Sequence, residues 1–441
     1  MISYKSIWKI AYPIMFGNLA QTIIALTDTA FLGRISEVAL GASAMAGIYY
    51  YVFSTLAWGF ALGVQVIIAR RFGEKNYPRI GVIFEHGLVV VTMLGVLLFM
   101  LLKFLSPEIL RLLISSDHVY ETALRFIDYR SYGIFFVCIN YLFRSLYIGV
   151  SNTKVISYTT ALMATVNVAF NYFLVFGNMG FPELGVEGAA IASVIAEFSA
   201  MVFFFVFTFK VFPVKKFAMF KGHKFEFPLL KAIFKIAIPT MLQKLISFGT
   251  WLVFFSFVEK MGERPLASTM TVRSGYMMLG IPIYAFGATT NTLVSRLIGE
   301  GKLNDVMPTV TRILKLCFIS LLPMALFASL APSVMLNIYT DNTDLIASSI
   351  NSVYVVVFSA FCLGYGMVFF EAISGTSNTH HGMYLEVIVL LSYIFTAWLT
   401  SSYLKLNVEW VWLSEVVYGA ILGLLSMFYM LKYNWRKHRR M

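Results

Sequence analysis

Long apolar runs dominate the chain and recur at intervals that suit helices crossing a membrane. Runs such as 87–102 and 195–209 contain almost no charged residues. A transmembrane helix needs about 20 mostly apolar residues, whereas a barrel strand alternates apolar and polar positions over about ten. The pattern therefore predicts an all-α integral membrane protein, because helices satisfy their own backbone hydrogen bonds inside lipid.

Twelve spans are predicted from these runs. They cover residues 7–32, 41–69, 81–102, 124–149, 155–177, 185–209, 229–258, 266–295, 308–331, 346–375, 383–404 and 409–431. The longest connector, 210–228, is rich in Pro, Gly and Lys and is expected to be a cytoplasmic linker. It would separate an N-terminal lobe, 1–209, from a C-terminal lobe, 229–441, that ends in a basic cytoplasmic tail.

Composition and charge agree with a multi-pass membrane protein. The chain is 59% hydrophobic and 13% charged, against about 25% charged residues in soluble proteins. Its net charge of +12 does not indicate a nucleic-acid partner, because the Lys and Arg residues are concentrated in the connectors on one side of the predicted membrane. The predicted connectors on the side of the two termini carry 21 Lys and Arg, against 7 on the other side. Both termini are therefore expected in the cytoplasm.

The two halves of the chain repeat one another. The segment "IWKIAYPIM" at 7–15 returns as "IFKIAIPTM" at 233–241, and "ARRFGE" at 69–74 returns as "SRLIGE" at 295–300. The turn "GVSNT" that begins at Gly149 returns as "GTSNT" from Gly375. Two six-helix lobes related by a pseudo-two-fold axis along the membrane normal follow, and transporters of this design bind substrate between the repeats.

Polar side chains inside the spans give a candidate cation site. Their helical spacing places them on shared faces: 3 and 7 residues apart in the first span, 4 apart in the fifth and 4 apart in the sixth. The candidates are Asn18, Gln21 and Asp28, then Asn167 and Asn171, then Ser193 and Glu197. The functional interpretation is a carboxylate, Asp28, that takes up H⁺ or Na⁺ among amide and hydroxyl groups. The alternatives are a carboxylate wetted at a helix end, interhelical amide hydrogen bonds and an ion pair at Glu197.

The second half does not copy this chemistry. Lys244 and Ser247 occupy the positions of Asn18 and Gln21, and Asp28 maps onto an apolar run. A cation site confined to the N-terminal lobe is therefore expected. Lys244 is a candidate cavity residue that would be the counter-charge for an anionic substrate or for a carboxylate across the cavity, or else a structural partner for a local acid. Aromatic and Met side chains in spans two and eight are candidates to line a substrate cavity for flat, lipophilic cations, or they are ordinary packing residues. These candidates are Tyr50, Tyr51, Trp58, Tyr276 and Met277.

The chain resembles the multidrug and toxic compound extrusion (MATE) family, with its DinF-like branch as the nearest. The resemblance covers nearly the whole chain. It is carried by "TDTAFLGRIS" at 27–36, "LGVEGAAIASVIAE" at 184–197, the "GVSNTK" and "GTSNTH" turns and the repeated "KIAxP" openings. It implies a secondary antiporter of a bacterial or archaeal cytoplasmic membrane that exchanges organic cations for H⁺ or Na⁺. A monomer without a cofactor is expected, in contact with the lipid bilayer.

The resemblance also assigns roles to individual residues. The coupling carboxylate of the family's first span falls on Asp28, and its Asn-x-x-x-Asp pattern falls on Asn167 and Asn171, where the second acid is an amide. The hydroxyl of span six falls on Ser193. If Na⁺ is the coupling ion, Asp28, Asn167 and Asn171 would be its ligands, and Glu197 would supply the charge that Asn171 lacks.

Other functions remain open at this point. No P-loop, nucleophile or metal motif is present in the sequence, which argues against an enzyme or a directly ATP-driven pump. A flippase for a lipid-linked oligosaccharide or another amphiphile, with the same fold, is the main alternative. Such a flippase would need a cavity dense in Arg and Lys for its phosphates, and few basic residues lie within the spans. A membrane scaffold without transport is a third hypothesis.

Overall fold

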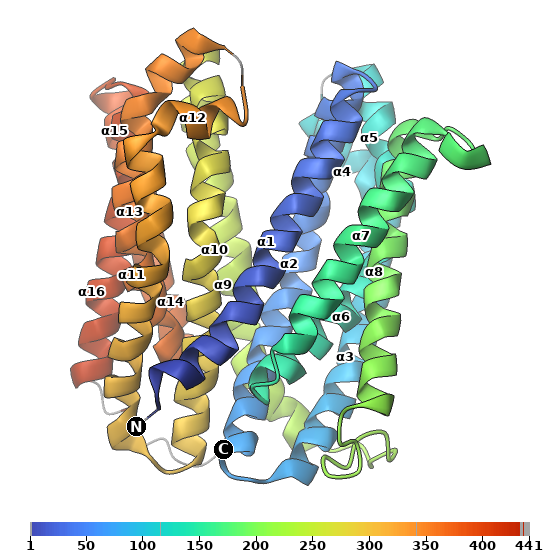
Figure 1. The fold of residues 1–441 in the computed structure, drawn as a ribbon, viewed down its shortest axis with the longest axis vertical. Helices are drawn as coiled ribbons and strands as arrows, with labels where there is room; N and C mark the ends of the chain where they lie inside the picture. The colour runs from blue at the N-terminus through green and yellow to red at the C-terminus, as the bar shows by residue number, and fades with distance from the viewer. Residues whose placement is uncertain (1, 115, 341, 433–434, 436–441) are drawn as a thin grey trace. The chain divides into compact units, whose positions relative to one another are not determined.

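The fold is all-α in the part of the chain that the structure, a computed structural model, describes: residues 2–114, 116–340, 342–432 and 435 (Figure 1). The elements are α1 (Tyr4–Gly33), α2 (Glu37–Gly73), α3 (Tyr77–Phe104), α4 (Ser106–Leu113), α5 (Asp117–Arg130), α6 (Gly133–Gly149), α7 (Lys154–Phe176), η1 (Asn178–Gly180), α8 (Gly185–Lys210), α9 (Phe227–Glu259), α10 (Glu263–Gly299), η2 (Leu303–Asp305), α11 (Val306–Leu330), α12 (Pro332–Asn337), α13 (Thr343–Gly375), α14 (Thr379–Trp398), η3 (Leu399–Tyr403), α15 (Val408–Val411) and α16 (Leu413–Lys432). The predicted basic tail, with Arg436, Lys437, Arg439 and Arg440, lies outside the described residues.

The membrane-spanning helices agree with the sequence. Among the described residues, 11 helices are long and apolar enough to cross a membrane, or up to 12 if α5 and α6 form one span. These two helices are bent by 53° relative to each other, at the break between Arg130 and Gly133. The predicted span at 124–149 therefore corresponds to a broken helix. Its repeat counterpart, α13, is continuous.

The chain forms two compact units, and each unit includes the first part of one helix from the other half of the sequence. The N unit is Phe16–Met241, and the C unit is Met1–Met15 with Leu242–Met441. The chain passes from one unit to the other inside α1 and inside α9, two residues after Pro13 and Pro239 respectively. The lobes predicted at 1–209 and 229–441 do not include this exchange and stay a prediction.

Equivalent contacts hold the exchanged helix starts. In the C unit, Trp8 of α1 lies 6.2 Å from Phe286 of α10, measured between ring centroids. In the N unit, Phe234 of α9 lies 5.8 Å from Phe60 of α2. Both residues of the first pair correspond to residues of the second through the sequence repeat, in which Trp8 matches Phe234 and Phe60 matches Phe286. The duplication therefore extends to packing.

The repeated turns also pack in the same way. Gly149, at the end of α6, lies against Gln65 and Ile68 of α2, and Gly375, at the end of α13, lies against the matching residues of α10, Asn291 and Val294. A Cβ atom on Gly375 would lie 2.7 Å from the backbone oxygen of Asn291, which is too close for any side chain. This contact requires glycine.

Replacing Gly375 with Ala is therefore expected to destabilise the protein by about 1–3 kcal/mol, because a fixed backbone atom must move. Gly249 in α9 is the matched control, since nothing lies within 4 Å of its Cβ position. Gly249→Ala is expected to be neutral or to stabilise by about 0.5–1 kcal/mol, since alanine is the better helix residue. Thermal unfolding in detergent measures both variants, and equal losses of stability would contradict the close-approach explanation.

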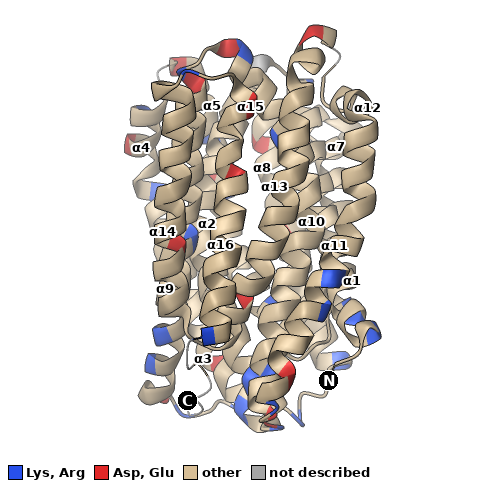
Figure 2. Ribbon diagram, turned by 90° about the vertical axis from the view of Figure 1, so that its left-hand side faces the viewer, with Lys and Arg blue, Asp and Glu red and all other residues tan. Residues whose placement is uncertain are grey.

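Charged side chains are sorted by position along the helices. Figure 2 shows many of the Lys and Arg side chains of the C unit at the helix ends near the N-terminus, with fewer charges along the middle of its helices. The orientation itself, with both termini in the cytoplasm, stays a prediction. The few charges within the spans are therefore the candidates for function.

Candidate functional site

The predicted cation-site residues of α1, α7 and α8 meet in the N unit. Asn171 donates a hydrogen bond through Nδ2 to Asp28 Oδ1 at 2.6 Å. The same nitrogen lies 3.1 Å from Asn167 Oδ1, and Asn167 Nδ2 lies 3.3 Å from Ser193 Oγ. A continuous polar chain therefore leads from Ser193 to the carboxylate of Asp28. The i, i+4 spacing on α7 places both amides on the face toward α1 and α8.

The surroundings of this chain fit a cation. Asn167 and Asn171 are both 0% exposed, whereas Asp28 is only half-buried. Asn171 Oδ1 is buried and has no hydrogen-bond partner among the described residues. A buried, unpartnered acceptor is costly unless a ligand or proton donor satisfies it. Amide and carboxylate oxygens are the ligand types that hard cations prefer.

The other two residues of the predicted α1 stripe lie elsewhere. Asn18 accepts a hydrogen bond from Arg144 Nη2 of α6 at 2.9 Å. Gln21 is exposed. Of the three stripe residues, Asp28 is therefore the one that joins the amides of α7.

Glu197 is bound by a partner that sequence reasoning did not identify. Its two carboxylate oxygens accept hydrogen bonds from Arg130 at 2.5 and 2.7 Å, and both side chains are almost buried, with 12% and 13% exposure. The ring of Tyr50 covers the guanidinium at 4.0 Å, and Asn140 Nδ2 donates to the backbone oxygen of Glu197 at 2.9 Å. The charge of Glu197 is thus balanced by Arg130 in this conformation, at the bend between α5 and α6.

The C unit also contains buried carboxylates, which are not among the predicted site residues. Glu386 of α14 is 2% exposed and accepts hydrogen bonds from Ser247 Oγ at 2.8 Å and Tyr418 OH at 2.7 Å. Its Oε2 atom is buried without a partner in the described structure. Lys244 lies one turn before Ser247 on α9 and is half-buried. Confinement of the cation site to the N-terminal lobe therefore stays a prediction, to be tested against Glu386.

Tyr50 and Tyr276 occupy matching positions of the repeat but contact different groups. Tyr276 donates to Glu415 Oε2 at 2.7 Å, and Tyr393 donates to Glu415 Oε1 at 2.9 Å. Tyr50 instead covers a guanidinium. Tyr276 and Glu415 are 139 residues apart, and Tyr393 and Glu415 are 22 apart. No local pattern pairs them, so the signal available in the sequence was the presence of acids inside apolar spans. The structure does not bring the six predicted cavity residues together in one unit, since Tyr50, Tyr51 and Trp58 belong to the N unit and Lys244, Tyr276 and Met277 to the C unit.

Exposure separates these cavity candidates further. Tyr51 and Met277 are 41% and 44% exposed, whereas Tyr50 and Tyr276 are buried. Trp58 is half-buried. Tyr50 and Tyr276 therefore present almost no surface to a ligand or to lipid, whereas Tyr51 and Met277 present much of theirs.

Comparison with known proteins agrees with the fold and the repeat. The family model MatE matches residues 13–173 and again 239–399, so the two matches lie one repeat length apart. "Probable multidrug resistance protein NorM" of Thermotoga maritima is 23% identical over 438 residues, which cover 98% of this chain and 93% of that protein. "Probable multidrug resistance protein YoeA" of Bacillus subtilis is 20% identical over 99% of this chain and 96% of its own length.

Solved structures share the architecture. A multidrug resistance MATE family transporter in an outward-facing conformation has a TM-score of 0.89 at 18% identity, covering 98% of this chain and 97% of its own. A MOP superfamily transporter from Pyrococcus furiosus has a TM-score of 0.90 at 18% identity, with coverages of 99% and 97%. Because the family model matches most of the sequence in two copies, the chain belongs to the MATE family of membrane transporters.

Proposed function

We propose that this chain is a secondary-active antiporter that exports organic cations and other amphiphilic xenobiotics in exchange for H⁺ or Na⁺. The observation that carries the proposal is the hydrogen bond between the buried Asn171 amide and Asp28. This bond links the Asp28 carboxylate to a hydrogen-bond network in which one buried oxygen, Asn171 Oδ1, has no partner among the described residues. The names of the NorM and YoeA relatives supply the substrate class, multidrug resistance.

Asp28 binds the incoming cation in this scheme. Neutralisation of its charge changes how α1 packs against α7, since the Asp28–Asn171 bond joins the two helices. Pro13 removes a backbone hydrogen bond from α1 and makes bending easier there. The passage between the two compact units falls just after this proline and after Pro239 in α9. Rocking of the units about these two points would expose substrate alternately to the two sides.

The remaining assignments follow from the same proposal. The protein acts as a monomer in a bacterial or archaeal cytoplasmic membrane, with both termini in the cytoplasm and no cofactor. Its substrates are lipophilic cations. The flippase alternative is not favoured by the charges of the N unit, because Arg130 is neutralised by Glu197 and Arg144 binds Asn18.

Transport in liposomes tests the function. Purified protein is reconstituted with a fluorescent lipophilic cation, and a pH gradient and a Na⁺ gradient are imposed separately. We expect a gradient of the coupling ion, H⁺ or Na⁺, to drive dye accumulation against its concentration, because binding of the ion and binding of substrate are reciprocally coupled. The control is empty liposomes under the same gradients. Dye movement that ignores both gradients, or translocation of a lipid-linked sugar in their absence, would contradict antiport.

A further inference from the structure

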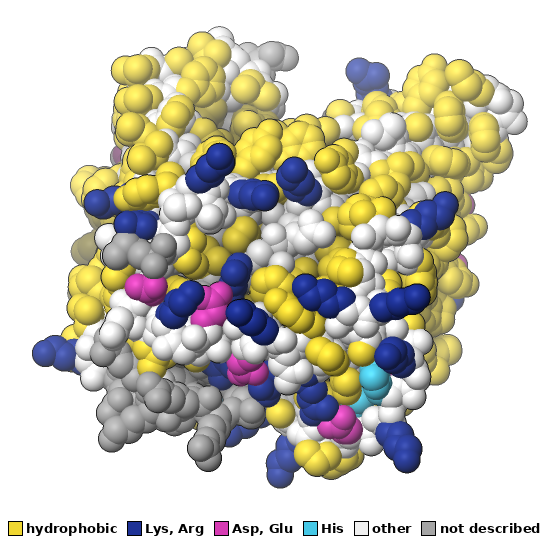
Figure 3. All heavy atoms as spheres, turned by 60° about the horizontal axis from the view of Figure 1, so that its bottom comes forward, with side chains coloured by type: hydrophobic (Ala, Val, Ile, Leu, Met, Phe, Trp, Pro, Cys, Tyr) yellow, Lys and Arg dark blue, Asp and Glu magenta, His cyan; other side chains and the backbone are white. Residues whose placement is uncertain are grey.

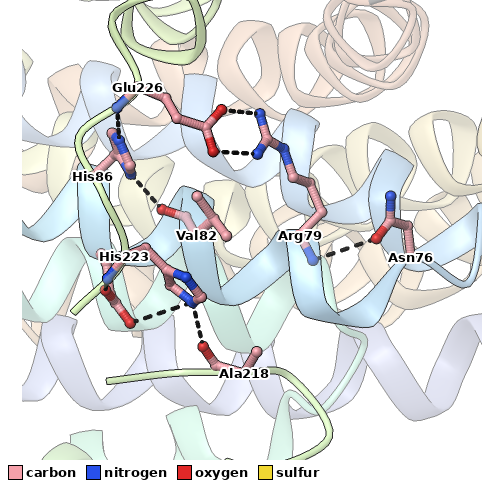
Figure 4. Close-up of polar contacts among 8 residues, drawn as sticks. Asn76, Arg79, Val82, His86, Ala218, His223 and Glu226 are labelled. Atoms are coloured by element: carbon pink, nitrogen blue, oxygen red, sulfur yellow. Dashed lines mark hydrogen bonds and ion pairs between the residues drawn. The ribbon is translucent and has the colours of Figure 1, made fainter. Parts of the chain in front are cut away.

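The connector between α8 and α9, residues 211–226, is a folded segment held on the first turns of α3. The backbone amides of Lys221 and His223 donate to the two carboxylate oxygens of Glu85 at 2.9 and 3.0 Å. The His223 ring, in turn, donates through Nε2 to the backbone oxygen of Ala218 at 2.7 Å (Figure 4). One carboxylate of α3 thus fixes the middle of the connector.

A second set of contacts fixes the end of the connector. Glu226 donates its backbone N–H to His86 Nε2 at 2.8 Å, while Nδ1 of that ring lies 2.8 Å from the backbone oxygen of Val82. Arg79 binds the Glu226 carboxylate through two nitrogens, each at 2.7 Å (Figure 4). This fork holds the pKa of the Glu226 carboxyl below its usual range, so the carboxylate stays ionised and neutralised by arginine.

The backbone of the connector has a fixed and unusual shape. Ala218 and Phe220 adopt the left-handed conformation, with φ of 50° and 56°. Such conformations are costly for residues other than glycine and persist only where the surroundings impose them. Phe217 and Met219 are buried between these turns. The connector is therefore a rigid support rather than a flexible tether.

The outer side of this support is strongly basic. Its exposed lysines are Lys215, Lys216, Lys221 and Lys224, and the exposed Lys210 ends α8 directly before it. We call these five lysines, together with the connector, the linker platform. The one carboxylate within residues 211–226 is Glu226, which Arg79 neutralises. Figure 3 looks onto this end of the molecule, where dark blue Lys and Arg side chains dominate and apolar side chains lie between them.

Exposed apolar side chains flank the platform. Phe209, Val211 and Phe227 are 58%, 65% and 71% exposed, and they lie where α8 ends and α9 begins. Because both helices are candidate membrane spans, the platform lies at the membrane surface. Large apolar side chains next to basic ones are typical of segments that rest at the boundary between headgroups and acyl chains.

We infer that the linker platform binds anionic phospholipid headgroups of the adjacent leaflet. Rigid spacing of the lysines distinguishes it from a disordered basic tail, since the Glu85, His86 and Arg79 contacts order the connector before lipid binds. The positive lysines attract the negatively charged phosphates of lipid headgroups. The flanking Phe and Val side chains favour lipid over a soluble polyanion, because they can enter the acyl-chain boundary. Each Lys close to an anionic surface is expected to strengthen binding about fivefold.

Lipid retention tests the inference. The full-length protein is placed in nanodiscs of phosphatidylcholine with phosphatidylglycerol, and native mass spectrometry compares the two lipids that stay bound. We expect preferential retention of phosphatidylglycerol, and a loss on the order of 100-fold in that preference when Lys215, Lys221 and Lys224 are changed to Gln, since each lysine contributes about fivefold. The Glu85→Gln variant keeps every lysine but weakens the hold on the connector, and a smaller loss is expected from it.

The matched control removes the same number of positive charges elsewhere in the chain. Lys5, Lys154 and Lys302 are exposed and lie at the starts of α1 and α7 and in the loop after α10. Their triple Gln variant is expected to keep the phosphatidylglycerol preference. Equal losses in both triple variants would overturn the inference, because they would show a general charge effect. Lysine-dependent binding of a short RNA without any change in lipid retention would overturn it too.

Discussion

Replacing Asp28 with Asn is expected to reduce gradient-driven dye transport by about tenfold or more, which is the size of a typical coupling between two sites. The amide cannot exchange a proton and carries no charge for Na⁺, so cation binding would no longer change the state of α1. Folding should survive, because the carbonyl oxygen of the introduced amide can still accept the hydrogen bond that Asn171 now donates to Asp28 at 2.6 Å. The loss should thus be one of coupling rather than of structure.

Transport in liposomes under the driving gradient measures the effect, with thermal unfolding as the check on folding. Asp128→Asn is the matched control, because Asp128 belongs to the same unit but is an exposed residue paired with Lys103. It should transport normally. An Asp28→Asn protein that transports at the normal rate would remove Asp28 from the mechanism.

The Glu386→Gln variant tests whether the cation site lies in the N-terminal lobe alone. Glu386 is a carboxylate of the C unit whose Oε2 atom is buried and has no hydrogen-bond partner among the described residues. If the coupling cation binds in the N-terminal lobe alone, this variant should retain gradient dependence. A loss equal to that of Asp28→Asn would show that both units take part in cation exchange.

Periodicity and repetition predicted much of this molecule. The apolar runs located the spans within a few residues, for example 7–32 against the observed α1 at Tyr4–Gly33. The i, i+4 spacing put Asn167 and Asn171 on one face, and the structure places both on the chain that reaches Asp28. These features depend on neighbours along one helix, whose geometry is set by the backbone alone.

Features that depend on how helices register against one another could not be predicted in this way. Arg130 and Glu197 lie in different helices, 67 residues apart, and no local pattern pairs them. Composition placed the lobe boundary at the connector, whereas the compact units change over inside α1 and α9, where no change in composition marks the point. The connector itself was predicted only as a linker. Its order comes from contacts with Arg79, Glu85 and His86, which lie more than 100 residues earlier, in α3. No pattern within the connector indicates these partners.

Removing the carboxylate of Glu197 is expected to destabilise the N unit by roughly 3 kcal/mol. Arginine stays charged in proteins, so Glu197→Gln would leave the Arg130 guanidinium nearly buried beside an amide. Breaking one side of a buried pair typically costs about 3–5 kcal/mol, and the lower end applies here because the pair is 12–13% exposed. Thermal unfolding in detergent should show a drop of several degrees. Asp128→Asn is the same kind of change in an exposed pair, and it should lower the free energy of unfolding by less than about 1 kcal/mol.

A double variant separates the stability of this pair from its role in transport. Arg130→Met with Glu197→Leu replaces both charges by apolar groups of similar size, and such replacements are often neutral or stabilising. The double variant should therefore unfold at a higher temperature than Glu197→Gln, and a double variant as unstable as the single one would contradict the buried-charge explanation.

The pair lies where α5 breaks before α6, and broken helices in transporters tend to lie near their binding sites. If the pair also sets the bend between α5 and α6, the double variant should fold but transport slowly. If it only stabilises the fold, restored stability should bring back full transport.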